Sequence, residues 1–178
     1  MLAEGGKRRL EVLGWGLIPP WADDPQIGSR MINARAETEK PSFRRAFYER
    51  GCLIPADGFY GWKPTNGSKQ PYYIHMKQKH PFAFAGLQES WNDNDGPAIW
   101  SCTILTTGPD TLVGEIHDRM PVILPAGSYD AWLDPEAGRD ELAALLAPYP
   151  EDEMEAYPVS RFVNSPLNND PRCVEPAA

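Results

Sequence analysis

Proline is the residue that most constrains how this chain can fold. The 178 residues include 19 prolines, about twice the usual share of ~5%. Each proline fixes one backbone dihedral and removes one hydrogen-bond donor, so proline-rich sequences rarely form long helices or central strands. We therefore expect short secondary-structure elements joined by ordered loops.

The spacing of apolar residues predicts three short helices, over residues 41–50, 127–133 and 140–147. In the first, Phe43, Ala46 and Phe47 share one face, and Gly51 follows as a stop signal. Asp140 is a candidate cap for the third helix.

Strand-forming stretches lie at 52–54, 70–77, 82–87, 98–107 and 120–124, with turn residues at 65–68 and 92–96. Over 98–107, apolar residues occupy both sides of the alternation, which predicts a strand that is covered on both faces. The set predicts an α+β fold, with a mostly antiparallel, curled or barrel-like sheet and short peripheral helices. Because no repeat or linker interrupts the chain, we expect one domain over residues 1–178, with a C-terminal tail from about residue 165.

The net charge of −8 is unevenly distributed along the chain. Residues 1–50 carry nine Lys or Arg against seven acidic residues, whereas residues 128–178 carry three against eleven. Local potential matters more than total charge for attracting a polyanion, so the arginine-rich first third is compatible with nucleic acid as a partner.

No apolar run approaches the ~20 residues that span a bilayer, and the N-terminus lacks the apolar core of a signal peptide. Cys52, Cys102 and Cys173 are an odd number of cysteines at unrelated spacings. This argues against a disulfide framework or a zinc ribbon and favours a reducing compartment. We expect a monomeric cytoplasmic protein with neither metal nor cofactor.

His117 is the first candidate for chemistry, because it stands between an apolar run and the charged pair Asp118-Arg119, just before a strand. Histidine exchanges protons near neutral pH, and an arginine can hold a phosphate with two hydrogen bonds. The alternative is a loop histidine bonded to a carbonyl, which is the commoner role for a lone histidine, with Arg119 paired to Asp118.

Asn33, Arg35 and Glu37 alternate, so an extended chain places an amide, a guanidinium and a carboxylate on one side. They form either the wall of a polar pocket or an exposed edge strand.

Aromatic and basic residues in the first third suit unpaired DNA. Trp15, Trp21 and Trp62 can stack on bases, although core packing is the commoner role for any one tryptophan. The arginines form either a track for phosphates or, in the predicted helix, a solvated face; they are Arg30, Arg35, Arg44, Arg45 and Arg50. We include Arg44 and Arg45 in the expected DNA-binding surface.

Seven motifs occur in one order over residues 15–133: WGLIPPW, NARAET, PSFRRAF, CLIPADGFYGW, KQPYYI, FAFAGLQESW and IHDRMPVIL. Together they resemble the SOS response-associated peptidase (SRAP) family of abasic site processing proteins, and PVSRFVN extends the resemblance to residue 164. The resemblance implies a DNA damage response protein that binds single-stranded DNA and reacts with the aldehyde of an abasic site. It also implies a peptidase or hydrolase that removes its own initiator methionine, and the cysteine so exposed closes a thiazolidine ring on the DNA in a covalent, lyase-like crosslink.

Carried over motif by motif, the resemblance implies catalytic roles for His117 and Asn33. His117 would assist opening of the abasic sugar, and Asn33 would hold the cysteine backbone or the adduct. The same resemblance implies that Trp15, Arg35 and Arg119 contact DNA.

Two positions depart from the family pattern. Leu2 stands where the family has its cysteine, and Trp15 follows too soon after the start, which predicts an N-terminally truncated domain. Gly61 replaces the catalytic glutamate of the family's GFYEW motif, with Glu37 and Glu89 as the nearest candidates to replace it.

Two main hypotheses follow. The first is an abasic-site crosslinking enzyme seen without its N-terminal segment, which leaves the 178-residue chain itself inactive in crosslinking. The second is a catalytically degenerate relative that still binds single-stranded DNA. An unrelated thiol or histidine hydrolase is a third.

Overall fold

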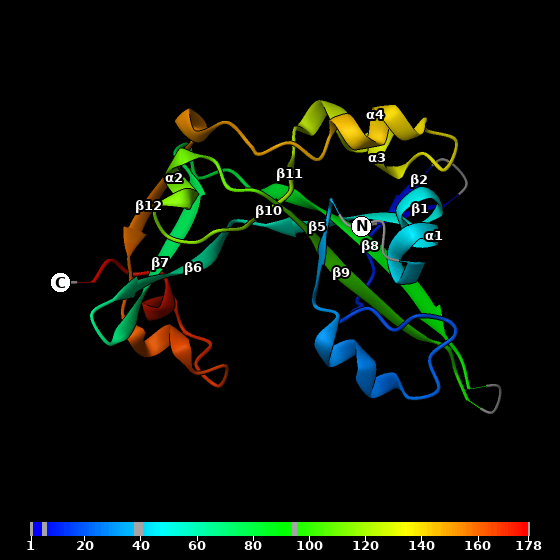
Figure 1. The fold of residues 1–178 in the computed structure, drawn as a ribbon, viewed down its shortest axis with the longest axis horizontal. Helices are drawn as coiled ribbons and strands as arrows, with labels where there is room; N and C mark the ends of the chain where they lie inside the picture. The colour runs from blue at the N-terminus through cyan, green and yellow to red at the C-terminus, as the bar shows by residue number, and fades with distance from the viewer. Residues whose placement is uncertain (1, 5–6, 38–40, 94–95, 178) are drawn as a thin grey trace. The chain divides into compact units, whose positions relative to one another are not determined.

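The computed structural model describes residues 2–4, 7–37, 41–93 and 96–177 (Figure 1). The chain divides into two compact units. Unit 1 comprises Met1–Pro55, Phe82–Thr107 and Pro121–Ala147, and unit 2 comprises Ala56–Pro81, Gly108–Met120 and Pro148–Ala178. One domain over residues 1–178 stays a prediction.

Unit 1 is built on two long antiparallel strands, β8 (Phe82–Trp91) and β9 (Ile99–Thr107), drawn in green in Figure 1. The strands β5 (Gly51–Ala56) and β11 (Ile123–Leu124) pair with β8. The short strands β3 (Gly14–Trp15) and β4 (Asn33–Arg35) each pair in parallel with β9. A further antiparallel pair joins β1 (Leu2–Glu4) to β2 (Lys7–Arg9), and β10 (Met120–Pro121) lies where the chain passes from unit 2 to unit 1.

Short helices accompany this sheet, and the three predicted helices are confirmed. They are α1 (Pro41–Glu49), α3 (Tyr129–Leu133) and α4 (Arg139–Ala144), with 3-10 turns η1 (Pro25–Arg30) and η2 (Ala126–Ser128). Asp140 as a helix cap is wrong: Gly138 occupies the N-cap, and Asp140 lies in the first turn, where a carboxylate still favours the positive helix end.

The core of unit 1 lies between these helices and the sheet. Its fully buried side chains include Leu53, Leu87, Leu105, Val122 and Trp132. Residues 101–107 of β9 are mostly buried, so the prediction of a strand covered on both faces is confirmed there, whereas Ile99 and Trp100 remain exposed.

Unit 2 contains an antiparallel sheet in the order β12–β7–β6. Its strands are β6 (Gly58–Thr65), β7 (Ser68–Met76) and β12 (Met154–Pro158). The predicted turn at 65–68 is confirmed, and Gly67 supplies the positive φ of 79° that it requires. Unit 2 also contains α2 (Thr111–Gly114), η3 (Glu151–Glu153), η4 (Arg161–Asn164) and η5 (Pro171–Cys173).

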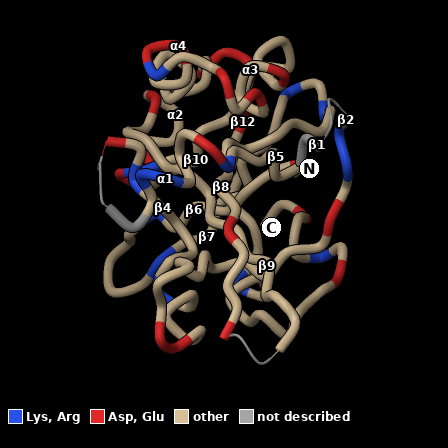
Figure 2. Tube along the Cα trace, turned by 90° about the vertical axis from the view of Figure 1, so that its right-hand side faces the viewer, with Lys and Arg blue, Asp and Glu red and all other residues tan. Residues whose placement is uncertain are grey.

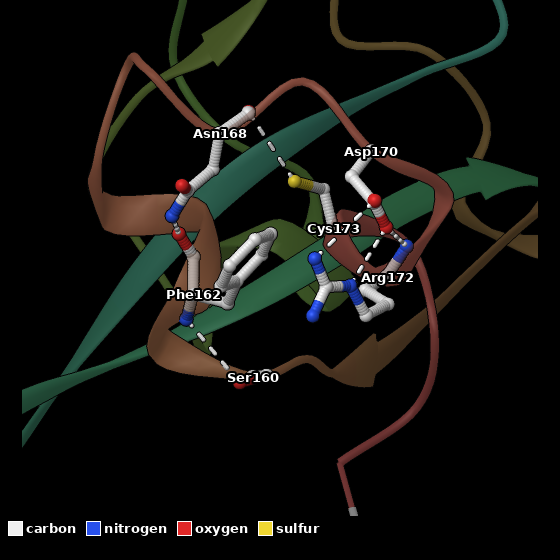
Figure 3. A network of polar contacts seen from close by, with 6 residues as sticks. All are labelled: Ser160, Phe162, Asn168, Asp170, Arg172 and Cys173. Carbon is white, nitrogen blue, oxygen red and sulfur yellow. Dashed lines mark hydrogen bonds and ion pairs between the residues drawn. The ribbon is translucent and has the colours of Figure 1, made fainter.

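The last residues of unit 2 are held by a polar network around η4 and η5 (Figure 3). Asp170 accepts from the backbone and side chain of Arg172, whose guanidinium lies over the Phe162 ring at 4.4 Å. Asn168 donates to the Phe162 carbonyl at 2.6 Å. The segment from residue 165 onward is therefore anchored to its own unit over the described residues, instead of extending as a loose end.

Mixed sheets with short helices confirm the α+β class, but the sheets differ in form from the prediction. The strand pairings of the described residues do not close into a curled or barrel-like sheet, because β3 and β4 add to β9 in parallel as short edge segments. Within the described ranges, no helix has both the length and the apolar character to cross a membrane. In the same ranges, no cluster of three or more His, Cys, Asp or Glu has the geometry to hold a metal ion.

Candidate functional site

Three of the predicted site residues lie in one row along an edge of β9. Trp15 pairs with Cys102 and Asn33 with Ile104, so β3 and β4 follow one another along the same strand. The Trp15 indole N–H donates to the Ile32 carbonyl at 2.8 Å, which fixes the ring beside the start of β4. We call Trp15, Asn33 and Arg35 the β4 row.

The alternation predicted for Asn33, Arg35 and Glu37 is confirmed for the first two, whereas Glu37 lies in the turn after β4. Asn33 and Arg35 are exposed, whereas Ala34 between them is buried in the core. Trp15 is 62% exposed although it is a large apolar residue. The row therefore offers solvent an aromatic face, an amide and a guanidinium, which are groups that stack on a base or bind a phosphate.

The arginines after the row have different environments. Arg45 pairs with Glu49 one helical turn away, at 2.8 Å, and this hydrogen bond raises the pKa of Arg45. The Arg50 Nε lies 3.6 Å from Oε2 of Glu89, which is only 2% exposed. Burial raises the pKa of Glu89, against the opposing effect of Arg50. Arg50 thus neutralises a buried carboxylate of its own unit, and Glu89 is held in that pair.

His117 is positioned by a tight turn in unit 2. Asp110 caps α2 by accepting from the backbone N–H of Val113 at 2.7 Å, and the backbone N–H of His117 then donates to the Val113 carbonyl at 2.8 Å. His117 itself is exposed. The turn therefore presents the imidazole to solvent from a fixed backbone.

The Nδ1 atom of His117 lies within hydrogen-bonding distance of the Arg119 backbone and of the Asp118 carboxylate. Nδ1 lies 3.1 Å from the backbone nitrogen of Arg119 and 3.2 Å from its carbonyl oxygen, so it accepts from the first or donates to the second according to the tautomer. Asp118 Oδ1 lies 3.1 Å from the same Nδ1, so a proton gained there forms an ion pair. His117 is therefore a loop histidine with a backbone partner, and an acidic side chain lies beside the same ring nitrogen.

Gly61 lies directly against the segment that carries His117. It is buried in β6, and a Cβ built on it would approach Cγ2 of Ile116 to 2.8 Å and Cδ1 of Ile74 to 3.3 Å. Ile116 is the residue before His117, so position 61 faces the His117 turn inside unit 2. The structure thus brings together two positions that the sequence separates by more than fifty residues.

Gly61→Ala is expected to lower the free energy of unfolding by about 1–3 kcal/mol, because its Cβ overpacks against Ile116. Urea denaturation measures the loss. In a double-mutant cycle, Ile116→Ala should make the Gly61→Ala substitution less costly. A Gly61→Ala protein as stable as the wild type, with no coupling to Ile116, would show that the turn has room for a side chain.

The three cysteines are buried and none forms a disulfide. Cys52 lies against Cys102, and burial raises the pKa of the Cys52 thiol to about 12. Burial also raises the pKa of Cys102. Cys173 is buried in the network of Figure 3, where its Sγ lies 3.5 Å from the Asn168 carbonyl. Cys102 is thus a buried residue of β9.

The predicted site residues therefore fall into two groups. Trp15, Asn33 and Arg35 belong to unit 1, whereas His117 and Arg119 belong to unit 2, beside position 61. The contact between Gly61 and Ile116 was not predicted, although the two motifs that contain these residues had been singled out separately.

Comparison with known proteins gives a consistent result. The family described as SOS response associated peptidase (SRAP) matches residues 1–166. The abasic site processing protein YoqW of Bacillus subtilis is 51% identical over 98% of this chain and 80% of its own length. The abasic site processing protein HMCES of Xenopus tropicalis is 32% identical over 97% of this chain and 58% of its own length. A crystal structure of a protein from Bacteroides thetaiotaomicron superposes with a TM-score of 0.87, at 35% identity, over 94% of this chain and 77% of that one.

Proposed function

Since the chain belongs to the SOS response associated peptidase (SRAP) family, we propose that it binds single-stranded DNA and acts in the processing of abasic sites. Several of its relatives carry abasic site processing in their names. DNA with an unpaired, base-free position presents neighbouring bases and phosphates to a protein surface. The proposal needs groups that stack on bases and groups that bind phosphates.

The observation that carries the proposal is the β4 row. The exposed Trp15 ring leaves apolar surface in water, and it lies next to an exposed amide and guanidinium; together these groups suit unpaired DNA. Figure 2 shows Lys and Arg positions in blue at β2 and α1, and acidic positions in red at α3 and α4. The basic positions of unit 1 are thus concentrated in its first fifty residues, despite the negative total charge.

We further propose that His117 transfers protons during opening of the abasic sugar, and that Asn33 positions the reacting group. The exposure of the His117 imidazole and the position of Asp118 Oδ1, 3.1 Å from Nδ1, support this role. In family members with an N-terminal cysteine, the amine and thiol would then close a thiazolidine ring on the aldehyde with loss of water.

A second candidate function is DNA binding without covalent chemistry. Gly61 favours this candidate, because glycine has no side-chain carboxylate that could take the role of the family's glutamate. Glu89, one of the candidates to replace it, is buried in an ion pair with Arg50. The two candidates share the DNA-binding surface and differ only in the reaction.

Arg35→Ala and Arg119→Ala are each expected to weaken binding to single-stranded DNA of any sequence. If each arginine contacts one phosphate, the slope of log K against log salt should flatten by about 0.7 per substitution. Fluorescence anisotropy with a labelled oligothymidylate between 50 and 300 mM salt measures both quantities. Lys69→Ala, which removes an exposed positive charge from β7, is the matched control. Unchanged affinity and slope in both arginine variants would refute the proposed DNA surface.

A further inference from the structure

Unit 1 contains a cavity of about 300 Å³ beside the β4 row. It lies among β4, α1 and α4, over the β8–β9 sheet. Its floor is formed by the buried side chains of Ala34, Leu87 and Leu105, and Phe43 and Phe47 of α1 form one wall. On the opposite side, Ala143 and Leu146 complete an apolar chamber that is open to solvent.

The mouth of this cavity is positively charged. Among the residues that the structure describes, its lining includes Arg35, Arg44 and Arg139 against one acidic residue, Asp140. Arg139 is held over the Tyr48 ring, with its guanidinium carbon 4.5 Å from the ring centre. Three guanidinium groups around an apolar chamber are unusual in a chain of net charge −8, and they make this mouth complementary to an anionic ligand.

The lining distinguishes between two kinds of anionic ligand. A nucleobase carries several hydrogen-bonding groups on its edge, and the floor and wall side chains are apolar apart from the Tyr48 hydroxyl, so a base buried there would lose most of its hydrogen bonds to water. An aromatic or aliphatic side chain has no such cost and gains from burial of its apolar surface. Carboxylates next to that side chain would meet the arginines at the mouth.

From this combination we propose that the cavity between α1 and α4 is a docking site for an acidic peptide segment of a partner protein, anchored by one large apolar side chain. The apolar side chain enters the chamber, and flanking carboxylates pair with Arg44 and Arg139. Such a site would bring a partner protein to a surface adjacent to the β4 row, since Arg35 belongs to both. The inference concerns a different ligand from DNA; because Arg35 and Arg44 are also expected to contact DNA, the Ala143→Trp variant separates the two ligands.

The test uses a fluorescein-labelled acidic peptide of ten residues with a central Phe, and its binding to the full chain is measured by anisotropy. Replacing that Phe by Ser should weaken binding about tenfold or more, because the apolar anchor is lost. Arg44→Gln with Arg139→Gln should weaken binding and reduce its dependence on salt, whereas Lys69→Gln should do neither.

Cavity filling provides the test that does not depend on charge. Ala143→Trp places a large side chain in the chamber from an exposed position of α4 and should abolish peptide binding, whereas Ala144→Trp, on the same helix but outside the lining, should not. Circular dichroism verifies that both variants fold. Equal binding of the Phe and Ser peptides, or full affinity in the Ala143→Trp protein, would overturn the proposal. If the Ala143→Trp protein alone loses oligothymidylate binding, the cavity binds DNA. If it alone loses self-association, the cavity binds a second copy of the chain. Either result would also overturn the proposal.

Discussion

The 178-residue chain is expected to form no covalent adduct with single-stranded DNA that carries one abasic site. A stable thiazolidine needs an amine and a thiol two carbons apart, and only an N-terminal cysteine presents both. Residue 2 of this sequence is leucine, and the nitrogens of the three cysteines are tied up in peptide bonds. Burial raises the pKa of Cys52 to about 12 and that of Cys102 above its usual value, so neither offers a thiolate at neutral pH.

The measurement is a denaturing gel after incubation of the protein with labelled abasic DNA. The same incubation with a short peptide that begins with cysteine verifies that the aldehyde is reactive. Binding to intact single-stranded DNA is followed in parallel, so that a missing adduct is not mistaken for missing contact. A band that survives denaturation, and that disappears when Cys52, Cys102 and Cys173 are replaced by Ser, would show that an internal thiol reacts and that an N-terminal cysteine is not required.

The helices were predictable because their signals are local. Over α1, the spacing of Phe43, Ala46 and Phe47 and the Gly51 stop all lie within eleven residues. The alternation of Asn33, Ala34 and Arg35 is equally local, so the exposed side of β4 could be predicted from the sequence. Short-range patterns of this kind survive folding because the same backbone geometry generates both the pattern and the element.

The strands β6 and β12 were missed because they depend on partners far away in the sequence. The β6 stretch contains Gly58, Gly61 and Pro64, which weaken any strand signal, and it becomes a strand by pairing with β7. The five residues of β12 pair with β7 across about eighty residues of chain. The parallel pairing of β3 and β4 with β9 was missed for the same reason, since two or three residues carry no measurable period.

The candidate site shows the same division between local and distant information. The sequence motifs identify His117 and Gly61 as two separate positions of interest. Only the fold shows that position 61 faces Ile116, the residue before His117. The arginines were all predicted as one possible track, because sequence spacing cannot show which charges find a partner. Glu89 lies 39 positions after Arg50 and comes beside it only when β8 forms next to the end of α1.

Arg50→Met is expected to lower the free energy of unfolding by on the order of 3 kcal/mol at neutral pH, because it leaves the buried Glu89 carboxylate without its counter-charge. The Arg50 side chain is only 27% exposed, so water replaces little of the lost interaction. By contrast, Arg45→Met removes a solvent-exposed pair with Glu49 and should cost little. Urea denaturation of the three proteins measures these differences.

The pH dependence identifies the carboxylate as the cause. Burial already raises the pKa of Glu89, and Arg50 opposes that rise, so removing Arg50 raises this pKa further. A carboxyl with a raised pKa in the folded state favours folding at low pH and loses that contribution as the pH rises through the folded pKa. The penalty of Arg50→Met should therefore grow between pH 5 and pH 8. Adding Glu89→Gln to Arg50→Met should recover most of the lost stability and make the unfolding free energy less dependent on pH. If the penalty is constant with pH, or unaffected by Glu89→Gln, Arg50 instead stabilises the fold through the packing of its aliphatic stem.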